Sequence, residues 1–325
     1  MNQDRAFALK TPRWPAIDAA RGVALLAMFV FHIGWDLSYF GLAPQTLDSD
    51  PRFHAFGHTI AGAFIALAGV GLTLAARNGL DGRQALRRLA TIAGAALGVT
   101  LVTYFIFPDA YIFFGILHLI AVAGLLSLPF LAAPSWLVAL IAAVALALPF
   151  VAAAPAFNAD ALLWLGLGTK IPLTNDWRPL LPWFGVMLAG LLLGRAILAR
   201  GLPAPVTDWA PRGVVGKALT LGGRHSLLLY LVHQPIFIAI IFVISVLVGP
   251  QYGASIDAFR TSCESQCVAS SGQPALCTRA CGCIADEAQK QGMGGAVAQN
   301  RLSSDQRVTF DAITKACIRR EPPAP

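Results

Sequence analysis

Seven apolar stretches, each long enough to cross a lipid bilayer, constrain the fold of this chain more than any other feature. A helix rises about 1.5 Å per residue and the hydrocarbon core is roughly 30 Å thick, so about 20 residues make one crossing. Only 13% of the 325 residues are charged and 56% are hydrophobic, whereas a soluble domain carries about 25% charged residues. The sequence therefore predicts an all-α, polytopic membrane helix bundle with about seven transmembrane helices, at residues 19–41, 57–76, 89–108, 111–131, 135–153, 179–199 and 225–249.

The basic residues gather on one side of these stretches. Arg21 and three other basic residues lie before or at the start of the first stretch, and four arginines lie between the second and third. Five basic residues lie at the end of the sixth stretch or between it and the seventh. The positive-inside rule then predicts a cytoplasmic N-terminus in a multi-pass protein of the cell inner membrane. The net charge of +7 is explained by this asymmetry, and we expect no nucleic-acid partner. The predicted parts are a cytoplasmic segment (1–15), a transmembrane domain (16–249) and an extracytoplasmic tail (250–325).

All six cysteines lie in the tail, which suggests three disulfides in an oxidising compartment. Two C-x3-C pairs would each lie on one face of a helix. Two such helices packed antiparallel would be joined twice, which leaves the remaining two cysteines to pair, although six cysteines allow fifteen connectivities. A zinc site is the alternative, but the tail contains no histidine. We expect a small helical cap stapled by Cys263, Cys267, Cys277, Cys281, Cys283 and Cys317, with a capping box at Ser303 opening its last helix.

The first apolar stretch, RGVALLAMFVFHIGWD from Arg21 to Asp36, contains titratable residues. Such groups are costly in lipid unless they face a partner or a cavity, so each is a candidate functional residue. His32 lies 11 residues beyond Arg21, or roughly 16 Å along a helix. Asp36 lies one turn further on the same face, where a carboxylate can orient an imidazole that acts as a general base.

Two further histidines, His118 and His233, are expected near the same depth on the fourth and seventh stretches. His54 and His58 lie at the expected outer end of the second. Each intramembrane histidine has an alternative role as an interhelical hydrogen-bond partner. A metal site built from three of them has no support in their spacing. We expect a polar reaction chamber without a metal.

Four ordered blocks resemble a known family: DAARGVALLAMFVFH (18–32), FGILH (114–118), RPLLPWFG (178–185) and GRHSLLLYLVHQP (223–235). They are similar to the bacterial membrane proteins grouped with heparan-alpha-glucosaminide N-acetyltransferase, and the resemblance covers about residues 13–245. The broader transmembrane acyltransferases that modify sugars share an arginine, ten intervening residues and a histidine. Arg21 and His32 fit that pattern.

The resemblance implies transfer of an acyl group, commonly acetyl from acetyl-CoA, to an amine or hydroxyl of a sugar across the membrane. His32, assisted by Asp36, would be the general base or the acyl carrier. Arg21 and Arg224 would bind the phosphates of the acyl-CoA co-substrate. The family's histidine in the first lumenal loop, next to a Trp-Asn pair, has no clean match here. The other candidate substrate-binding residues are His54, His58, His118, Trp183, His233 and Gln234.

Two other classes of function stay open on the sequence. A proton-coupled transporter or channel-like protein would also use intramembrane histidines, but such proteins often show internal repeats, and none is found here. A membrane scaffold acting through its tail would not need His32 to react. Lipid, acyl-CoA and a sugar or glycan acceptor are the expected partners, and a homo-oligomer is compatible with the sequence.

Overall fold

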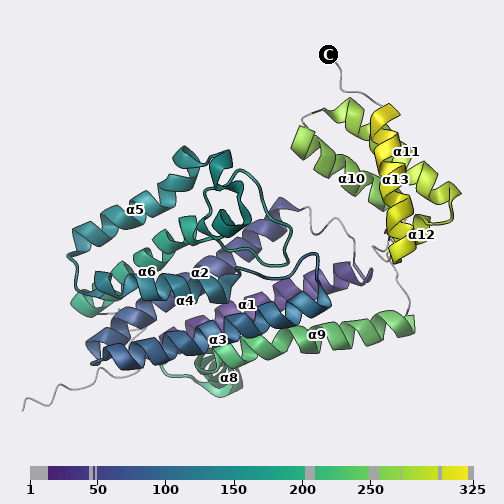
Figure 1. The fold of residues 1–325 in the computed structure, drawn as a ribbon. Helices are drawn as coiled ribbons and strands as arrows, with labels where there is room; N and C mark the ends of the chain where they lie inside the picture. The colour runs from purple at the N-terminus through teal and green to yellow at the C-terminus, as the bar shows by residue number, and fades with distance from the viewer. Residues whose placement is uncertain are drawn as a thin grey trace, which may run out of the picture. The chain divides into compact units, whose positions relative to one another are not determined.

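The structure is a computed structural model, and its described residues form helices and the segments that connect them, without a β-strand (Figure 1). The chain divides into two compact units, which are described separately: residues 1–28 with 58–232, and residues 29–57 with 233–325. The residues that the structure describes are 14–43, 47, 50–201, 209–248, 256–271, 273–298 and 302–320.

Six helices of the described residues are long and apolar enough to span a membrane, so the chain is a multi-pass membrane protein. Each overlaps one predicted apolar stretch, with ends that differ from the prediction by at most seven residues. They are α1 (Pro15–Tyr39), α2 (Pro51–Arg77), α3 (Gly82–Ile106), α5 (Ser135–Ala152), α6 (Leu180–Arg200) and α9 (Ser226–Val248).

The stretch expected at 111–131 differs from the prediction of one long helix. Its helix α4 (Ile116–Ser127) has 12 residues and is followed by a 3-10 turn, Pro129–Leu131. The preceding segment is tied to α3, because the Ile112 N–H donates to Thr103 Oγ1 (3.0 Å) and Thr100 Oγ1 donates to the Ile112 carbonyl (2.7 Å). Six long helices and one short helix therefore take the place of seven long ones.

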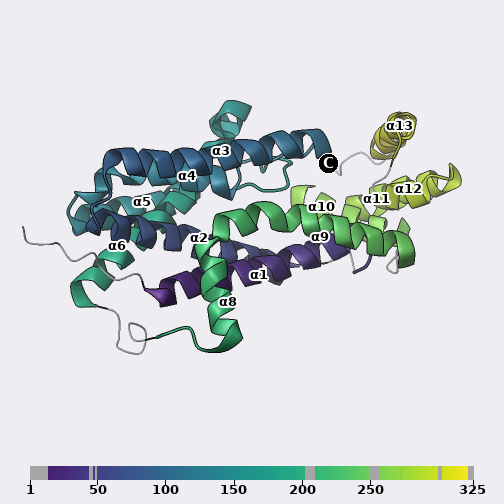
Figure 2. The ribbon, with the colours of Figure 1, turned by 90° about the horizontal axis from the view of Figure 1, so that it is seen from below.

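In the first unit, α5 packs on α6, and α4 packs on both α3 and α6 (Figure 2). Their shared core contains Leu119 of α4, Val138 of α5 and Leu188 of α6, all fully buried. α2 meets α6 backbone to backbone, because a Cβ at Gly190 would collide with the backbone of Ala66. Small residues permit this close helix approach in a membrane, where apolar burial alone does not drive helices together.

Two connections in this unit carry short helices of their own. The connection from α5 to α6 contains the 3-10 helices Pro155–Asn158 and Asp160–Leu165. The connection from α6 to α9 contains α8 (Gly213–Arg224). α8 lies directly against α1, because a Cβ at Gly223 would overlap the Asp18 carbonyl.

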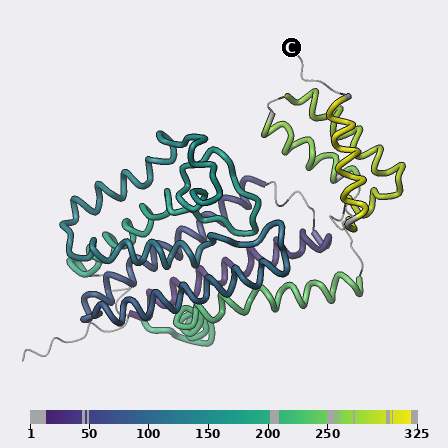
Figure 3. The backbone as a smooth tube through the Cα atoms, in the orientation of Figure 1, coloured from purple at the N-terminus to yellow at the C-terminus, as the bar shows by residue number. Residues whose placement is uncertain are grey.

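The described residues of the tail form four helices: α10 (Ile256–Ser271), α11 (Pro274–Lys290), α12 (Gly294–Ala298) and α13 (Ser304–Arg320). Figure 3 shows their backbone. The disulfide interpretation of the cysteines is confirmed. α10 and α11 are joined twice, and α11 is joined once to α13, as the antiparallel arrangement of the C-x3-C pairs predicts. The three bonds are Cys263–Cys281, Cys267–Cys277 and Cys283–Cys317.

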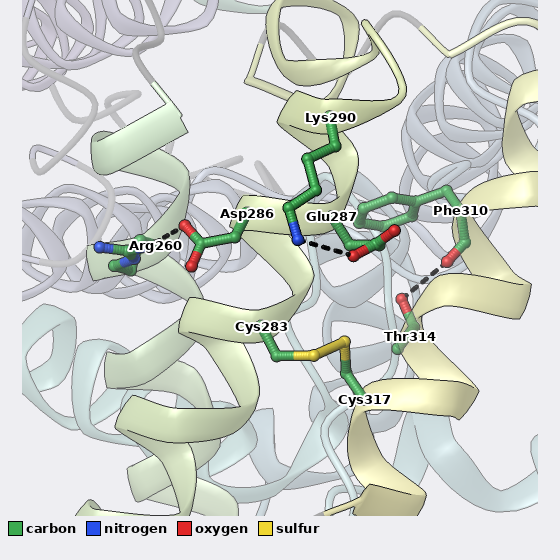
Figure 4. The surroundings of a disulfide bond; sticks show 8 residues. All are labelled: Arg260, Cys283, Asp286, Glu287, Lys290, Phe310, Thr314 and Cys317. Atoms are coloured by element: carbon green, nitrogen blue, oxygen red, sulfur yellow. Dashed lines mark hydrogen bonds and ion pairs between the residues drawn. A yellow bond between two sulfur atoms is a disulfide. The ribbon is translucent and has the colours of Figure 1, made fainter.

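The tail has a hydrophobic core of its own. Ile284, Ile313 and Cys317 are buried in it, and Phe259 packs edge-on against Phe310 with ring centroids 5.9 Å apart. Arg260 donates to Asp286 (2.6 Å) at its edge (Figure 4).

The capping box at the start of α13 is also confirmed. The Ser303 N–H donates to Gln306 Oε1 (3.0 Å), and the Gln306 N–H donates to Ser303 Oγ (3.3 Å). Two backbone donors that the helix itself leaves unpaired are satisfied in this way.

Candidate functional site

Two of the predicted histidines are neighbours in the second unit. His32 of α1 and His233 of α9 have ring centroids 4.9 Å apart at an interplanar angle of 61°. Phe29 stacks on His233 (5.3 Å), and Phe237 meets the same ring edge-on (5.7 Å). Each phenylalanine lies one turn from the histidine of its own helix, so both helices present one aromatic face to the other. The result is an imidazole pair enclosed by aromatic rings, with His233 only 5% exposed.

Asp36 and Gln234 join the same two helices. Asp36 is fully buried, and its Oδ1 accepts a 2.7 Å hydrogen bond from Gln234 Nε2. Asp36 lies on the predicted face of α1, but its hydrogen bond runs to α9 instead of to His32 one turn away. Pro235 follows Gln234 inside α9 and lacks the N–H that would bond to Leu231, so the helix ladder is interrupted beside this contact.

In the first unit, Arg21 and Arg224 converge on one carboxylate. Arg224 Nε lies 3.1 Å from Asp18 Oδ2, and Arg21 Nη1 lies 3.6 Å from Asp18 Oδ1. Arg21 also donates to the Leu67 carbonyl of α2 (3.4 Å), and a Cβ at Gly71 would lie 2.5 Å from the same guanidinium. Asp18 is 3% exposed, whereas the Arg224 side chain is 43% exposed. The three groups carry a net charge of +1, and Arg224 presents part of it to the surroundings.

Both ring nitrogens of His118, in the first unit, form hydrogen bonds, one with the residue before α4 and one with a residue of α3. The Gly115 N–H donates to Nδ1 (3.3 Å), and Nε2 lies 3.0 Å from Thr100 Oγ1. Because the Thr100 hydroxyl donates its proton to the Ile112 carbonyl, it accepts from His118, which assigns the neutral tautomer with the proton on Nε2. His118 therefore fastens the start of α4 to α3.

The remaining candidates lie on or near α2. His58 and Trp183 stack in the first unit, with ring centroids 5.8 Å apart and an interplanar angle of 12°. Gly62 leaves room for that indole, since a Cβ there would lie 3.6 Å from Trp183. His54 is exposed in the first turns of α2. Thus His32 and His233 form a pair, His58 stacks on Trp183, and His118 binds the backbone at the start of α4.

Sequence reasoning missed two acidic residues of these clusters. Asp18 stands three residues before Arg21, a spacing that places both on one helix face. Asp176 accepts the Ile116 N–H (2.8 Å) at the start of α4 and lies 3.7 Å from Arg178. The i, i+3 spacing of Asp18 and Arg21 could have identified Asp18 from the sequence. Asp176 contacts a residue 60 positions away, so no local spacing could have identified it.

The described residues contain no group of three or more His, Cys, Asp or Glu side chains placed to hold a metal ion. What they offer is imidazole chemistry: a neutral imidazole can accept a proton or act as a nucleophile. The paired rings are surrounded by aromatic groups and one carboxyl–amide contact. An arginine pair with surplus positive charge supplies a second feature, suited to anionic groups.

Comparison with known proteins identifies the family. The family model described as heparan-alpha-glucosaminide N-acetyltransferase, catalytic, matches residues 13–235, more than two thirds of the chain. No curated protein and no solved structure matches the chain. The matched region includes both histidines of the pair and all three residues of the Asp18 cluster. The chain therefore belongs to the heparan-alpha-glucosaminide N-acetyltransferase catalytic family and is a multi-pass membrane protein of an acetyltransferase family.

Proposed function

We propose that this protein transfers an acyl group, most simply acetyl, from cytoplasmic acyl-CoA to a hydroxyl or amine of an extracytoplasmic sugar or glycan. The observation that carries the proposal is the contact between His32 and His233, 4.9 Å apart on two membrane helices within the region matched by an acetyltransferase family. Reactive imidazoles inside the membrane suit a reaction whose donor and acceptor arrive from opposite sides.

Two chemical routes account for every bond and proton in this acyl transfer. In the first, His32 accepts the proton of the acceptor O–H or N–H while the acceptor atom attacks the thioester carbonyl. The carbon–sulfur bond breaks, and the leaving thiolate takes that proton to give free CoA. In the second, His32 itself attacks the thioester and releases CoA, and the acceptor then removes the acyl group from the imidazole. In both, His233 lies where it can contact the reacting ring.

The donor side of the proposal rests on Arg21 and Arg224. Acyl-CoA carries several phosphate charges and is made in the cytoplasm, where the basic loops are expected. The guanidinium groups of both arginines are shared with Asp18, so only part of their charge is available to a ligand. Arg224 is the more accessible of the two and the better candidate for a phosphate contact.

The first experiment measures acetyl-CoA binding and release of free thiol by the full chain in nanodiscs, with a panel of amino sugars and glycans as acceptors. His32→Ala should retain acetyl-CoA binding and lose thiol release. His225→Ala is the matched control, because His225 is exposed at the end of α8 and should behave as wild type. Absence of acetyl-CoA binding by folded wild-type protein would exclude the proposal.

Mass spectrometry of the protein after incubation with acetyl-CoA, without acceptor, separates the two routes. An acetyl group found on the peptide containing His32, and absent in His32→Ala, indicates the carrier route. Thiol release that requires acceptor, with no acetylated peptide, indicates the general-base route.

A further inference from the structure

The contact between Asp36 and Gln234 leaves two oxygen atoms without a partner. Gln234 Nε2 donates to Asp36 Oδ1 at 2.7 Å. The other oxygen of each group, Asp36 Oδ2 and Gln234 Oε1, is buried and has no hydrogen-bond partner among the residues that the structure describes. If Asp36 were ionised, both atoms would be acceptors and neither could satisfy the other.

An ionised Asp36 would also lack a counter-charge. Asp36 is 0% exposed, and among the described residues its hydrogen-bond partner is the uncharged Gln234, with no lysine or arginine paired to it. Within one turn of Asp36 and Gln234, α1 and α9 carry the titratable residues His32, Tyr39, Tyr230 and His233, and the two imidazoles contact each other. Burial of an unpaired carboxylate is strongly unfavourable, and such a group takes up a proton instead.

We propose that Asp36 is a neutral carboxylic acid at neutral pH and forms a reciprocal acid–amide pair with Gln234. The proton on Oδ2 converts one of the two unpaired acceptors into a donor, directed to Gln234 Oε1. The pair then has two hydrogen bonds, one in each direction, and no net charge. Asp36 and Gln234 are positioning residues that hold α1 against α9 beside the imidazole pair.

The proposal changes the part that Asp36 plays near His32. A neutral acid cannot stabilise an imidazolium as the carboxylate of a catalytic triad does. The imidazole pair would therefore rely on its own two rings when one of them takes up a proton. The protonation state of Asp36 does not depend on the proposed acetyl transfer, so the two can be tested separately.

Infrared difference spectroscopy of the full chain in nanodiscs at neutral pH tests the protonation state directly. The spectrum of wild type minus Asp36→Asn should contain the carbonyl stretch of a protonated carboxylic acid, shifted in heavy water. Exposed acids are ionised at neutral pH and do not absorb at the frequency of a protonated carboxylic acid. A difference spectrum that contains only carboxylate bands overturns the proposal.

Substitutions that preserve or break the pair give a second test. Asp36→Asn keeps a reciprocal pair of hydrogen bonds with Gln234 and should keep the thermal stability of wild type. Gln234→Glu places two acids together and should lower that stability, and the double variant Asp36→Asn/Gln234→Glu, which restores one acid and one amide, should recover it. A loss of thiol release in Asp36→Asn near the ~10⁴-fold seen when a triad aspartate becomes asparagine, in a variant that stays folded, would show instead that Asp36 acts as a carboxylate.

Discussion

Asp18 Oδ2 accepts a 3.1 Å hydrogen bond from Nε of Arg224, a residue 206 positions later in the chain. This contact ties the first turn of α1 to the end of α8. It also joins two of the sequence blocks that carry the family resemblance, because Asp18 opens one of them and Arg224 lies at the start of another.

Replacement of Asp18 by alanine should destabilise the protein by about 3–5 kcal/mol, since two guanidinium groups lose their shared buried partner. Arg224→Ala should cost about 1 kcal/mol or less, because its side chain is 43% exposed and partly screened by its surroundings. Equilibrium unfolding in detergent measures both changes. A double-mutant cycle isolates the coupling between the two residues, and additive effects would contradict the proposed ion pair.

Gly223 permits the close contact of α8 with α1. In Gly223→Ala the new methyl group would meet the backbone carbonyl of Asp18, which cannot move aside as a flexible side chain can. We expect a loss of about 1–3 kcal/mol. Gly98→Ala in α3 is the control, because nothing lies within 4 Å of its Cβ position, and it should gain about 0.5–1 kcal/mol from better helix propensity. Equal stabilities of the two variants in detergent unfolding would argue against the α1–α8 contact.

His118 and Thr100 should behave as one hydrogen-bonded unit. His118→Leu leaves the Gly115 N–H and the Thr100 hydroxyl without that partner, and an unsatisfied buried group costs about 1–3 kcal/mol. Thr100→Val should have a similar effect on unfolding free energy. The double variant should lose less than the sum of the two single losses, and hydrogen exchange should rise first in the amides at the start of α4. Unchanged exchange there would contradict the assigned contact.

The three disulfides of the tail should differ in their contribution to its stability. Cys283–Cys317 closes a separation of 34 residues and Cys267–Cys277 one of 10. The chain-entropy relation gives about 4 kcal/mol for the first and about 3 kcal/mol for the second. Paired alanine substitutions, followed by hydrogen exchange of tail peptides in the full chain, measure the order. A greater loss from removal of the shorter link would show that strain or residual structure outweighs loop closure.

The long apolar helices were predictable from the length of the apolar stretches, and the cysteine pairing from the spacing of the two C-x3-C pairs. A stretch of about 20 apolar residues has few alternatives to a membrane helix. The two C-x3-C pairs fix one face on each helix, so antiparallel packing determines their bonds and leaves Cys283 for Cys317. The shortened α4 was not predictable. Asp176 accepts a hydrogen bond from the Ile116 N–H at the start of α4, and these two residues are 60 positions apart in the chain.

The candidate site was predictable in composition but not in its contacts. Depth along a helix placed three histidines in one layer, yet depth contains no information on helix rotation. The structure pairs His32 with His233 and gives both nitrogens of His118 to Gly115 and Thr100. In the same way, spacing along α1 offered Asp36 only His32 as a neighbour, whereas the structure supplies Gln234 from another helix.

Because every cysteine lies in the tail, the oxidation state of the cysteines indicates the compartment in which the tail lies. The membrane helices contain no cysteine. Any thiol of this protein that an alkylating reagent labels in freshly lysed cells therefore belongs to the tail. Tails that mature where disulfides are introduced should take up no label until they are reduced, whereas tails retained on the reducing side should take up six. Gel mobility after alkylation with a bulky maleimide therefore reports, molecule by molecule, on which side of the membrane the chain ends.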